Sequence, residues 1–296
     1  MSGSGSKRLG DILGEVKRTL KASCTEDGED CSKISILLVS QMLGMDKTKV
    51  VVEKDLTIEE EDYQRIIYAA LKYAAGYPLQ YCTNRAYFMG LEFYVDENVL
   101  IPRFDTETLI EVAIEIFEGK ENLLFLDMGT GSGCIAVALC KFLPCRVVAV
   151  DISEDAIKIA RKNAKLNNVE NKIEFIKSDL FENIPSSYRF DAIISNPPYV
   201  SEKQISDLDR RVLKEPRIAL FSGEDGLWHF KQIAKNAGLY LKNGGYIILE
   251  VGYNQAKSVK SILQSLGYKN IDSKNDLSNI ERCVYARWEL SNISQG

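Results

Sequence analysis

Apolar residues recur at two different spacings, and the change of spacing divides the chain into two regions. From residue 7 to about residue 82 they follow the three- and four-residue spacing of amphipathic helices, as Leu9, Ile12 and Val16 do. Thr57 and Glu60 have the spacing of a capping box, which predicts that a helix begins here. We therefore expect residues 7–82 to form a small helical domain, which either positions a protein substrate or simply caps the next domain.

The pattern changes to alternation after residue 85. Two short alternating runs, 86–89 and 91–95, flank Gly90 and predict a β-hairpin. We assign residues 83–102 as a hairpin linker between two domains. A helical pattern follows over 106–118.

From residue 123 onward, short apolar runs alternate with helical patterns. This alternation predicts a seven-stranded, mostly parallel sheet with helices on both faces, in an α/β domain over residues 103–290. Ligands of such folds bind outside the carboxyl ends of the strands. The expected strands are 123–126, 146–150, 172–177, 190–195, 246–251 and two more within 268–290, and the expected helices are 135–142, 154–166, 225–241 and 255–266.

Composition excludes several function classes. The chain is 45% hydrophobic and has a formal net charge of -5, so general attraction to nucleic acid or to an anionic membrane is not expected. Its seven cysteines are scattered without a CxxC pair. We expect its one histidine, His229, to lie on a helix near the surface or at a contact, and we assign it no catalytic role. We predict reduced cysteines, no metal site and a cytoplasmic protein without signal peptide or membrane span. We assign no element to the start of the chain, residues 1–6.

A glycine-rich loop gives the first candidate site. Gly129, Gly131 and Gly133 lie between an expected strand and an expected helix, where glycine permits a tight turn and close approach of a ligand. Asp151 ends the next strand about 20 residues later, a position suited to the hydroxyls of a ribose. These features fit NAD, FAD or S-adenosylmethionine.

Two details favour S-adenosylmethionine. The loop reads GxGxG and not the GxGxxG typical of pyrophosphate binding. Asp179 follows the third strand, where it is placed to accept a hydrogen bond from an adenine amino group, with Leu180 and Phe181 as apolar walls. A solvated strand-end carboxylate is the alternative interpretation of Asp179. Asp127 either contacts the methionine ammonium or braces the loop.

A second candidate site follows the strand over 190–195. Asn196, Pro197, Pro198 and Tyr199 form a stiff loop, because the two prolines fix two φ angles and remove two donors. The Asn196 side-chain oxygen and the Pro197 carbonyl oxygen are suited to accept the two hydrogens of a planar NH₂ group beside the Tyr199 ring. The alternative is a turn that merely ends the strand.

Together these motifs resemble one family, the release-factor glutamine methyltransferases, also called PrmC or HemK proteins. The likeness extends from about residue 76 to residue 286, whereas residues 1–75 match only in general helical character. Asn-Pro-Pro-Tyr is shared with other amino-group methyltransferases, but the Ile-Pro-Arg and Glu-Pro-Arg segments are narrower signals. The matching segments are 77–81, 93–94, 99–103, 106–109, 127–136, 149–153, 195–199, 215–220 and 223–227.

The resemblance implies a Rossmann-like class I methyltransferase domain that uses S-adenosylmethionine and releases S-adenosylhomocysteine. The implied substrate is the glutamine of the Gly-Gly-Gln motif of peptide chain release factors, methylated at N5 by a monomer. Catalysis is assigned to Asn196, Pro197 and Tyr199, and substrate binding to these three together with Pro198; Asn196 also touches the cofactor. Residues 104–105 read Phe-Asp where family members usually read Pro-Glu. The cofactor set implied is Gly129, Thr130, Gly131, Ser132, Gly133, Asp151, Ile152, Asp179, Leu180 and Asn196.

Two other functions use the same features. A nucleic-acid methyltransferase acting on adenine N6 or guanine N2 has the same Asn-Pro-Pro-Tyr loop, but the acidic charge and the lack of a basic recognition domain argue against it. A binding protein with a vestigial fold is a third hypothesis, against which the intact glycine loop, Asp151 and Asn196 stand.

Overall fold

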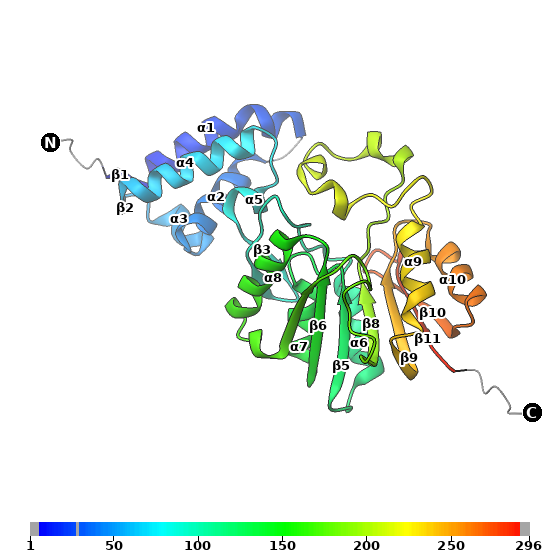
Figure 1. Cartoon of the computed structure of the whole chain (residues 1–296). Helices are drawn as coiled ribbons and strands as arrows, with labels where there is room; N and C mark the ends of the chain where they lie inside the picture. Colours follow the sequence, from blue (N-terminus) through cyan, green and yellow to red (C-terminus); the bar gives the residue numbers. More distant parts are fainter. Residues whose placement is uncertain (1–5, 28–29, 291–296) are drawn as a thin grey trace, which may run out of the picture. The chain divides into compact units, whose positions relative to one another are not determined.

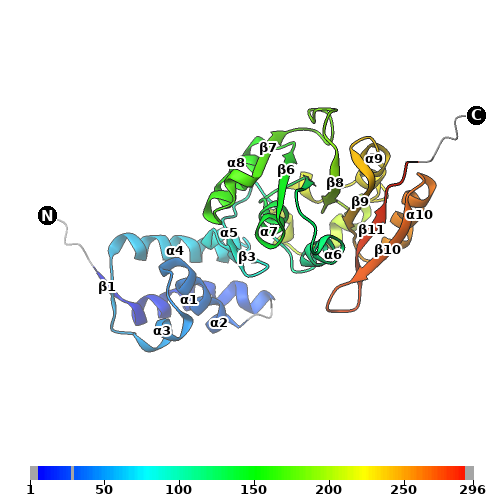
Figure 2. The ribbon, with the colours of Figure 1, turned by 90° about the horizontal axis from the view of Figure 1, so that it is seen from below.

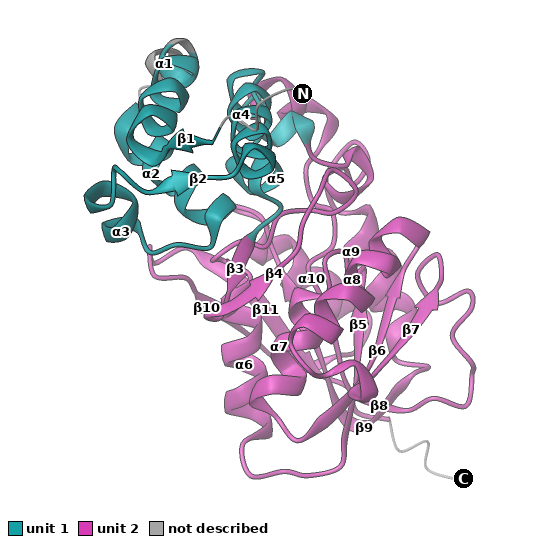
Figure 3. Cartoon of the chain, turned by 90° about the vertical axis from the view of Figure 1, so that its left-hand side faces the viewer, with its two compact units in different colours: residues 1–85, 209–214 teal, residues 86–208, 215–296 magenta. Residues whose placement is uncertain are grey.

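The computed structural model describes residues 6–27 and 30–290 of the chain, which divide into two compact units. The first unit comprises residues 1–85 and 209–214, and the second comprises residues 86–208 and 215–296 (Figure 3). Each unit has its own core, and each is described by itself. Residues 1–5, which belong to the start without a predicted element, lie outside the described residues.

The first unit is helical, as its spacing predicted. Its helices pack around a core that includes Leu9, Ile12, Ile66 and Tyr73. They are α1 (Leu9–Asp27), α2 (Cys31–Leu43), α3 (Lys47–Val52), α4 (Glu60–Ala74) and α5 (Leu79–Thr83) (Figure 1).

The predicted capping box at Thr57 is wrong. Thr57 and Ile58 form the short strand β2, which pairs with β1 (Lys7–Arg8), and α4 begins two residues later without a side-chain cap on Glu59. The extended pairing places Thr57 outside the first helical turn, so its hydroxyl cannot serve the amide of Glu60.

The second unit begins with the predicted hairpin, whose strands are β3 (Ala86–Phe88) and β4 (Leu91–Phe93). Phe88 and Phe93 are buried and meet edge to face, with ring centroids 6.3 Å apart. Both rings join the core beneath α6 (Glu107–Phe117) and α7 (Cys134–Phe142). The hairpin therefore packs as part of this unit.

The predicted sheet is confirmed. Seven strands lie in the order β10-β11-β9-β8-β5-β6-β7, and the five from β9 to β7 are parallel. Helices α6 and α7 cover one face and helices α9 and α10 cover the other (Figure 2). The strands are β5 (Leu123–Met128), β6 (Cys145–Asp151), β7 (Ile173–Lys177), β8 (Phe190–Ser195), β9 (Leu241–Glu250), β10 (Lys269–Asn275) and β11 (Glu281–Arg287), and the remaining helices are α8 (Glu154–Leu166), α9 (Trp228–Ala237) and α10 (Ala256–Ser265).

This sheet fixes where chemistry can occur. Parallel strands β5, β6, β7 and β8 end at the same edge, and the chain leaves each of them into a candidate segment. No helix of the described residues is both long enough and apolar enough to cross a membrane.

Candidate functional site

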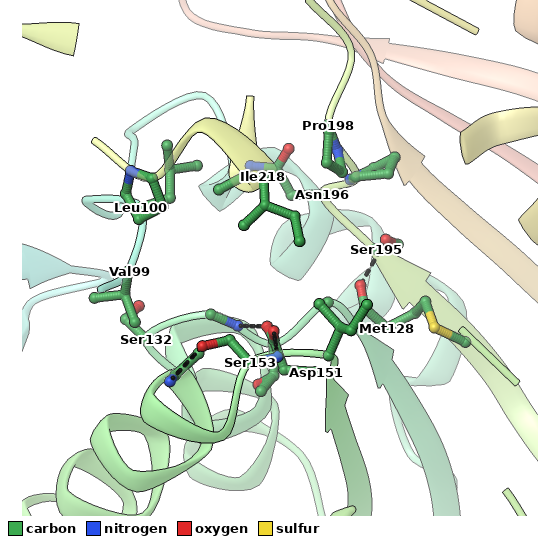
Figure 4. Close-up of a pocket in the computed structure, with 18 of the residues that line it drawn as sticks. Val99, Leu100, Met128, Ser132, Asp151, Ser153, Ser195, Asn196, Pro198 and Ile218 are labelled. Atoms are coloured by element: carbon green, nitrogen blue, oxygen red, sulfur yellow. Dashed lines mark hydrogen bonds between the residues drawn. The ribbon is translucent and has the colours of Figure 1, made fainter. Parts of the chain in front are cut away.

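One cavity in the second unit collects most of the predicted site residues (Figure 4). Asp151 and Ser132 lie on one side of it, and Leu100, Ile218 and Asn196 lie on the other. Of the residues predicted for the cofactor and the substrate, the lining includes Gly129, Thr130, Gly131, Ser132, Asp151, Ile152, Asp179, Leu180, Asn196, Pro197 and Pro198.

The glycine loop is anchored to the neighbouring strand. The backbone N–H groups of Gly129 and Thr130 both donate to the Val150 carbonyl, at 2.9 and 2.8 Å. Gly129 and Gly131 have φ of +75° and +54°, and a Cβ on either would project into open space. Gly133 does not line the cavity: its Cβ would meet that of Ala160 at 3.0 Å, so its role is close packing of α7 against α8.

Asp151 is oriented by two backbone donors. Its carboxylate accepts from the Gly131 N–H and from the Ser153 N–H, both at 2.9 Å. Burial raises the pKa of this carboxyl, and the backbone donors oppose that shift. Each carboxylate oxygen keeps a lone pair for a further donor, as the binding of ribose hydroxyls requires.

Asp127 braces the loop. It is fully buried beneath the glycines, and its Oδ2 accepts from the Thr130 hydroxyl at 2.6 Å and from the Ala136 N–H at 3.1 Å. Burial raises its pKa to about 7. Of the two interpretations considered from the sequence, these contacts support bracing, although its Oδ1 has no partner among the described residues.

The segment after β7 holds an unusual backbone. Leu180 has φ of +47°, a conformation that costs energy for a residue with a branched side chain. The Ser178 hydroxyl donates to the Leu180 carbonyl at 2.8 Å and accepts from the Asn183 N–H at 3.0 Å, which holds the turn. Asp179 and Leu180 both face the cavity as a result.

The Asn-Pro-Pro-Tyr loop contributes three of its four residues to the lining. The Asn196 side-chain nitrogen donates to the Thr106 hydroxyl at 3.0 Å. Tyr199 is not among the lining residues; its hydroxyl lies 3.4 Å from Glu250 and its carbonyl accepts from Gln255 at 3.0 Å. Burial raises the pKa of Tyr199, so the phenol stays protonated.

Two motif segments that are distant in sequence meet beside the cavity. Glu215, which is buried, accepts from the Ile101 N–H at 3.0 Å and from the Arg103 guanidinium. Burial raises the pKa of Glu215, and Arg103 acts in the opposite direction. The Ile-Pro-Arg and Glu-Pro-Arg motifs thus form one structural unit, which fixes the cavity wall at Ile101, Pro102 and Arg103.

Several lining residues were missed or misassigned from the sequence. His229 was expected at the surface or at a contact, but it lines the cavity, and its Nδ1 lies 2.8 Å from the Ser222 hydroxyl. Burial lowers the pKa of this imidazole. Thr106, Ile218 and Ser178 also line the cavity. Thr106 and Ile218 lie in the matching segments 106–109 and 215–220, but none of the three was assigned a role from the sequence.

Comparison with known proteins gives matches over both units. A family model described as the PrmC N-terminal domain matches residues 11–83, and one described as the methyltransferase small domain matches residues 104–230. A release factor glutamine methyltransferase of Streptococcus pneumoniae is 40% identical over 278 residues, which is 92% of this chain and 97% of that protein. One of Clostridium acetobutylicum is 35% identical over 282 residues, 94% of this chain and 98% of that protein.

Solved structures agree on the fold. The catalytic domain of hMettl16 in complex with an RNA hairpin has a TM-score of 0.57 at 16% identity, covering 79% of this chain and 82% of that one. A Thermus thermophilus 16S rRNA N2 G1207 methyltransferase in complex with AdoMet and guanosine has a TM-score of 0.53 at 20% identity, covering 69% of this chain and 50% of that one. At these identities the likeness concerns the fold alone.

Proposed function

The chain belongs to the family of release factor glutamine methyltransferases, and from this we propose what it does. It transfers a methyl group from S-adenosylmethionine to the N5 side-chain nitrogen of the glutamine in the Gly-Gly-Gln motif of peptide chain release factors. The observation that carries the proposal is the cavity itself, in which a glycine loop and the Asn-Pro-Pro corner face one space.

The residues of the cavity fit the cofactor. Gly129 and Gly131 leave open space where any other residue would project a side chain. Asp151 would hold the ribose hydroxyls, and Ile152 and Leu180 would pack on the adenine. S-adenosylmethionine supplies a methyl group already activated by a positively charged sulfur.

The chain's own task is to hold a poor nucleophile. The lone pair of a carboxamide nitrogen is delocalised into its carbonyl, so the nitrogen attacks only when it is well placed. The Asn196 Oδ1 and the Pro197 carbonyl oxygen accept its two hydrogens, which fixes its position and increases its electron density. Such placement contributes about 7–11 kcal/mol in favourable systems. The nitrogen gains the methyl group and releases one proton to solvent.

In this proposal each domain has its own role. Residues 7–82 position the release factor, residues 83–102 link them to the rest, and residues 103–290 carry out the transfer. The protein acts as a cytoplasmic monomer without nucleic acid. If an isolated Gly-Gly-Gln peptide and an intact release factor were methylated with equal kcat/KM, the positioning role would be refuted.

Mass spectrometry of a release factor after incubation with the protein and S-adenosylmethionine tests the activity. We expect the Gly-Gly-Gln peptide to gain the mass of one methylene group, and a DNA duplex offered in parallel to remain unmodified. An unmodified release factor, with cofactor binding intact by calorimetry, would refute the proposed function.

The Asn196→Ala variant tests the clamp, by which we mean the two acceptors Asn196 Oδ1 and the Pro197 carbonyl oxygen. It removes one of the two acceptors, and turnover should fall about 100-fold or more, by analogy with loss of one oriented polar group. Cofactor affinity should stay close to that of the parent, as measured by calorimetry. Asn171→Ala, at an exposed position outside the cavity, is the matched control. Parental turnover in Asn196→Ala would exclude the clamp.

A further inference from the structure

A short chain of hydrogen bonds runs from Asn196 into the protein. The Asn196 Nδ2 donates to the Thr106 Oγ1 at 3.0 Å, and the Thr106 hydroxyl donates to the Glu250 Oε2. Thr106 is 2% exposed and Glu250 is 1% exposed, so water does not compete for the bond between them. The three residues come from the loop after β8, the start of α6 and the end of β9.

While Glu250 is ionised, the hydrogen bonds of this chain can run in one direction only. An ionised carboxylate accepts hydrogen bonds and donates none. Thr106 has a single hydroxyl hydrogen, which it donates in the hydrogen bond to Glu250. The Thr106 oxygen can therefore act toward Asn196 only as an acceptor. The nitrogen end of the Asn196 amide must then face Thr106, and the oxygen end is left for the cavity that Asn196 lines.

We propose that Glu250, acting through Thr106, is a positioning residue that holds the Asn196 amide with its oxygen toward the substrate. This inference rests on the proposed function, because it explains how the clamp presents two acceptors and no donor. Without Thr106 and Glu250, the Asn196 amide is free to flip about its Cβ–Cγ bond. It would then present its NH₂ group to the NH₂ group of the glutamine. The same arrangement makes the site selective, because two acceptors bind a carboxamide nitrogen and repel a carboxylate oxygen.

The surroundings of Glu250 act on its ionisation in both directions. The Tyr199 hydroxyl lies 3.4 Å from its Oε1. Burial raises the pKa of Glu250 to about 7, Arg282 on β11 favours the ionised form, and Asp105 opposes it. Arg282 also pairs with Asp105 and Asp276, each at 3.1 Å, so it is fixed near the carboxylate.

A matched pair of substitutions at Thr106 tests the inference. Thr106→Val keeps the shape of the side chain but removes the donor and the acceptor, whereas Thr106→Ser keeps both. We expect kcat on the release factor to fall at least about 10-fold in Thr106→Val, because the partly buried Asn196 amide loses its partner and is free to flip. In Thr106→Ser we expect kcat within about threefold of the parent, since the hydroxyl is retained.

A second readout does not depend on turnover. With asparagine labelled selectively with ¹⁵N, the side-chain NH₂ signal of Asn196 is identified by its loss in Asn196→Asp. Its hydrogens should exchange slowly with water in the parent and in Thr106→Ser, and markedly faster in Thr106→Val and Glu250→Ala. Thermal unfolding and calorimetry with S-adenosylmethionine show whether each variant is folded and still loads the cofactor.

The outcomes separate the inference from the proposed function. Parental turnover and slow exchange in a folded Thr106→Val would overturn the positioning role while leaving the proposed function intact. Equal losses in Thr106→Val and Thr106→Ser would also overturn it, because packing and not the hydroxyl would then be responsible. If the parent failed to methylate any release factor, the proposed function would fall, and the exchange measurement would still decide whether Thr106 holds the amide.

Discussion

Two glycines of the same loop have similar backbone angles but serve different ends. Gly129 and Gly133 have φ of +75° and +81°, so an alanine at either position pays a similar strain, about 1–2 kcal/mol. Their surroundings differ, because a Cβ at Gly129 meets nothing within 4 Å and a Cβ at Gly133 lies 3.0 Å from that of Ala160. The first glycine leaves space for a ligand and the second permits helix packing.

A prediction follows for this pair. Gly129→Ala should weaken binding of S-adenosylmethionine while lowering stability only by the backbone strain. Gly133→Ala should lose more stability than Gly129→Ala, because α7 and α8 must move apart in addition. Calorimetry and urea unfolding of both variants measure the two quantities. A Gly129→Ala protein that binds the cofactor as the parent does would contradict the assignment of this space.

At the residue scale, the sequence predicted the site residues that lie near strand ends. It missed those that are distant in sequence and meet only in the folded protein. Gly131, Asp151 and Asn196 stand within a few residues of the ends of apolar runs, so their place at one edge of the sheet followed from the alternation of elements. Thr106 and Glu250 are 144 positions apart and meet only when α6 packs beside β9. No local pattern could indicate that they hold Asn196.

At the scale of elements, hydrophobic spacing was a sound guide except where backbone hydrogen bonding overrides it. Strand β9 begins at Leu241, five residues before the predicted start, because its glycine-containing entry pairs through a register shift with β8. Residues 209–214 lie between the expected strand 190–195 and the expected helix 225–241, and their spacing predicted no element. They group with the helical unit, in which the Arg211 guanidinium lies 4.2 Å from the centre of the Tyr73 ring.

The ion pair between Arg103 and Glu215 joins the Ile-Pro-Arg and Glu-Pro-Arg segments. Its loss should lower both the stability of the protein and its affinity for the cofactor. Arg103→Met would leave Glu215 buried without its cation, and breaking a buried pair costs about 3–5 kcal/mol. Since the Arg103 side chain is 35% exposed, water offsets part of this, and we expect about 1–3 kcal/mol. Urea unfolding measures the loss, and calorimetry should show weaker cofactor binding because Ile101 lines the cavity.

The control for this prediction is the double variant Arg103→Met, Glu215→Gln. Removing the buried charge together with its partner should restore part of the stability that Arg103→Met loses. If the double variant were as unstable as the sum of the two single variants, the two side chains would not be coupled.

At the scale of the whole molecule, two fully buried carboxyls link folding to pH. Burial raises the pKa of Asp127 and of Glu250 to about 7, well above their ordinary values of 3.8 and 4.5. The folded protein therefore binds more protons than the unfolded chain between about pH 4.5 and pH 7, and these groups lower stability as pH rises through that window. His229 acts in the opposite direction, because its pKa is lowered by burial.

The Glu250→Gln variant isolates one of these carboxyls and tests the sign. Its free energy of unfolding relative to the parent should increase from pH 5 to pH 8 by about 3 kcal/mol, the equivalent of a shift from 4.5 to about 7. The clamp needs the charged form, in which Glu250 accepts from Thr106. The parent's kcat should therefore fall as pH drops through about 7, and that fall should be absent in Glu250→Gln. Urea unfolding and kcat, each measured from pH 5 to pH 8, provide both curves. If the stability of Glu250→Gln relative to the parent did not change with pH, Glu250 would have an ordinary pKa. The ionised form would then not lower the stability of the fold while supporting kcat.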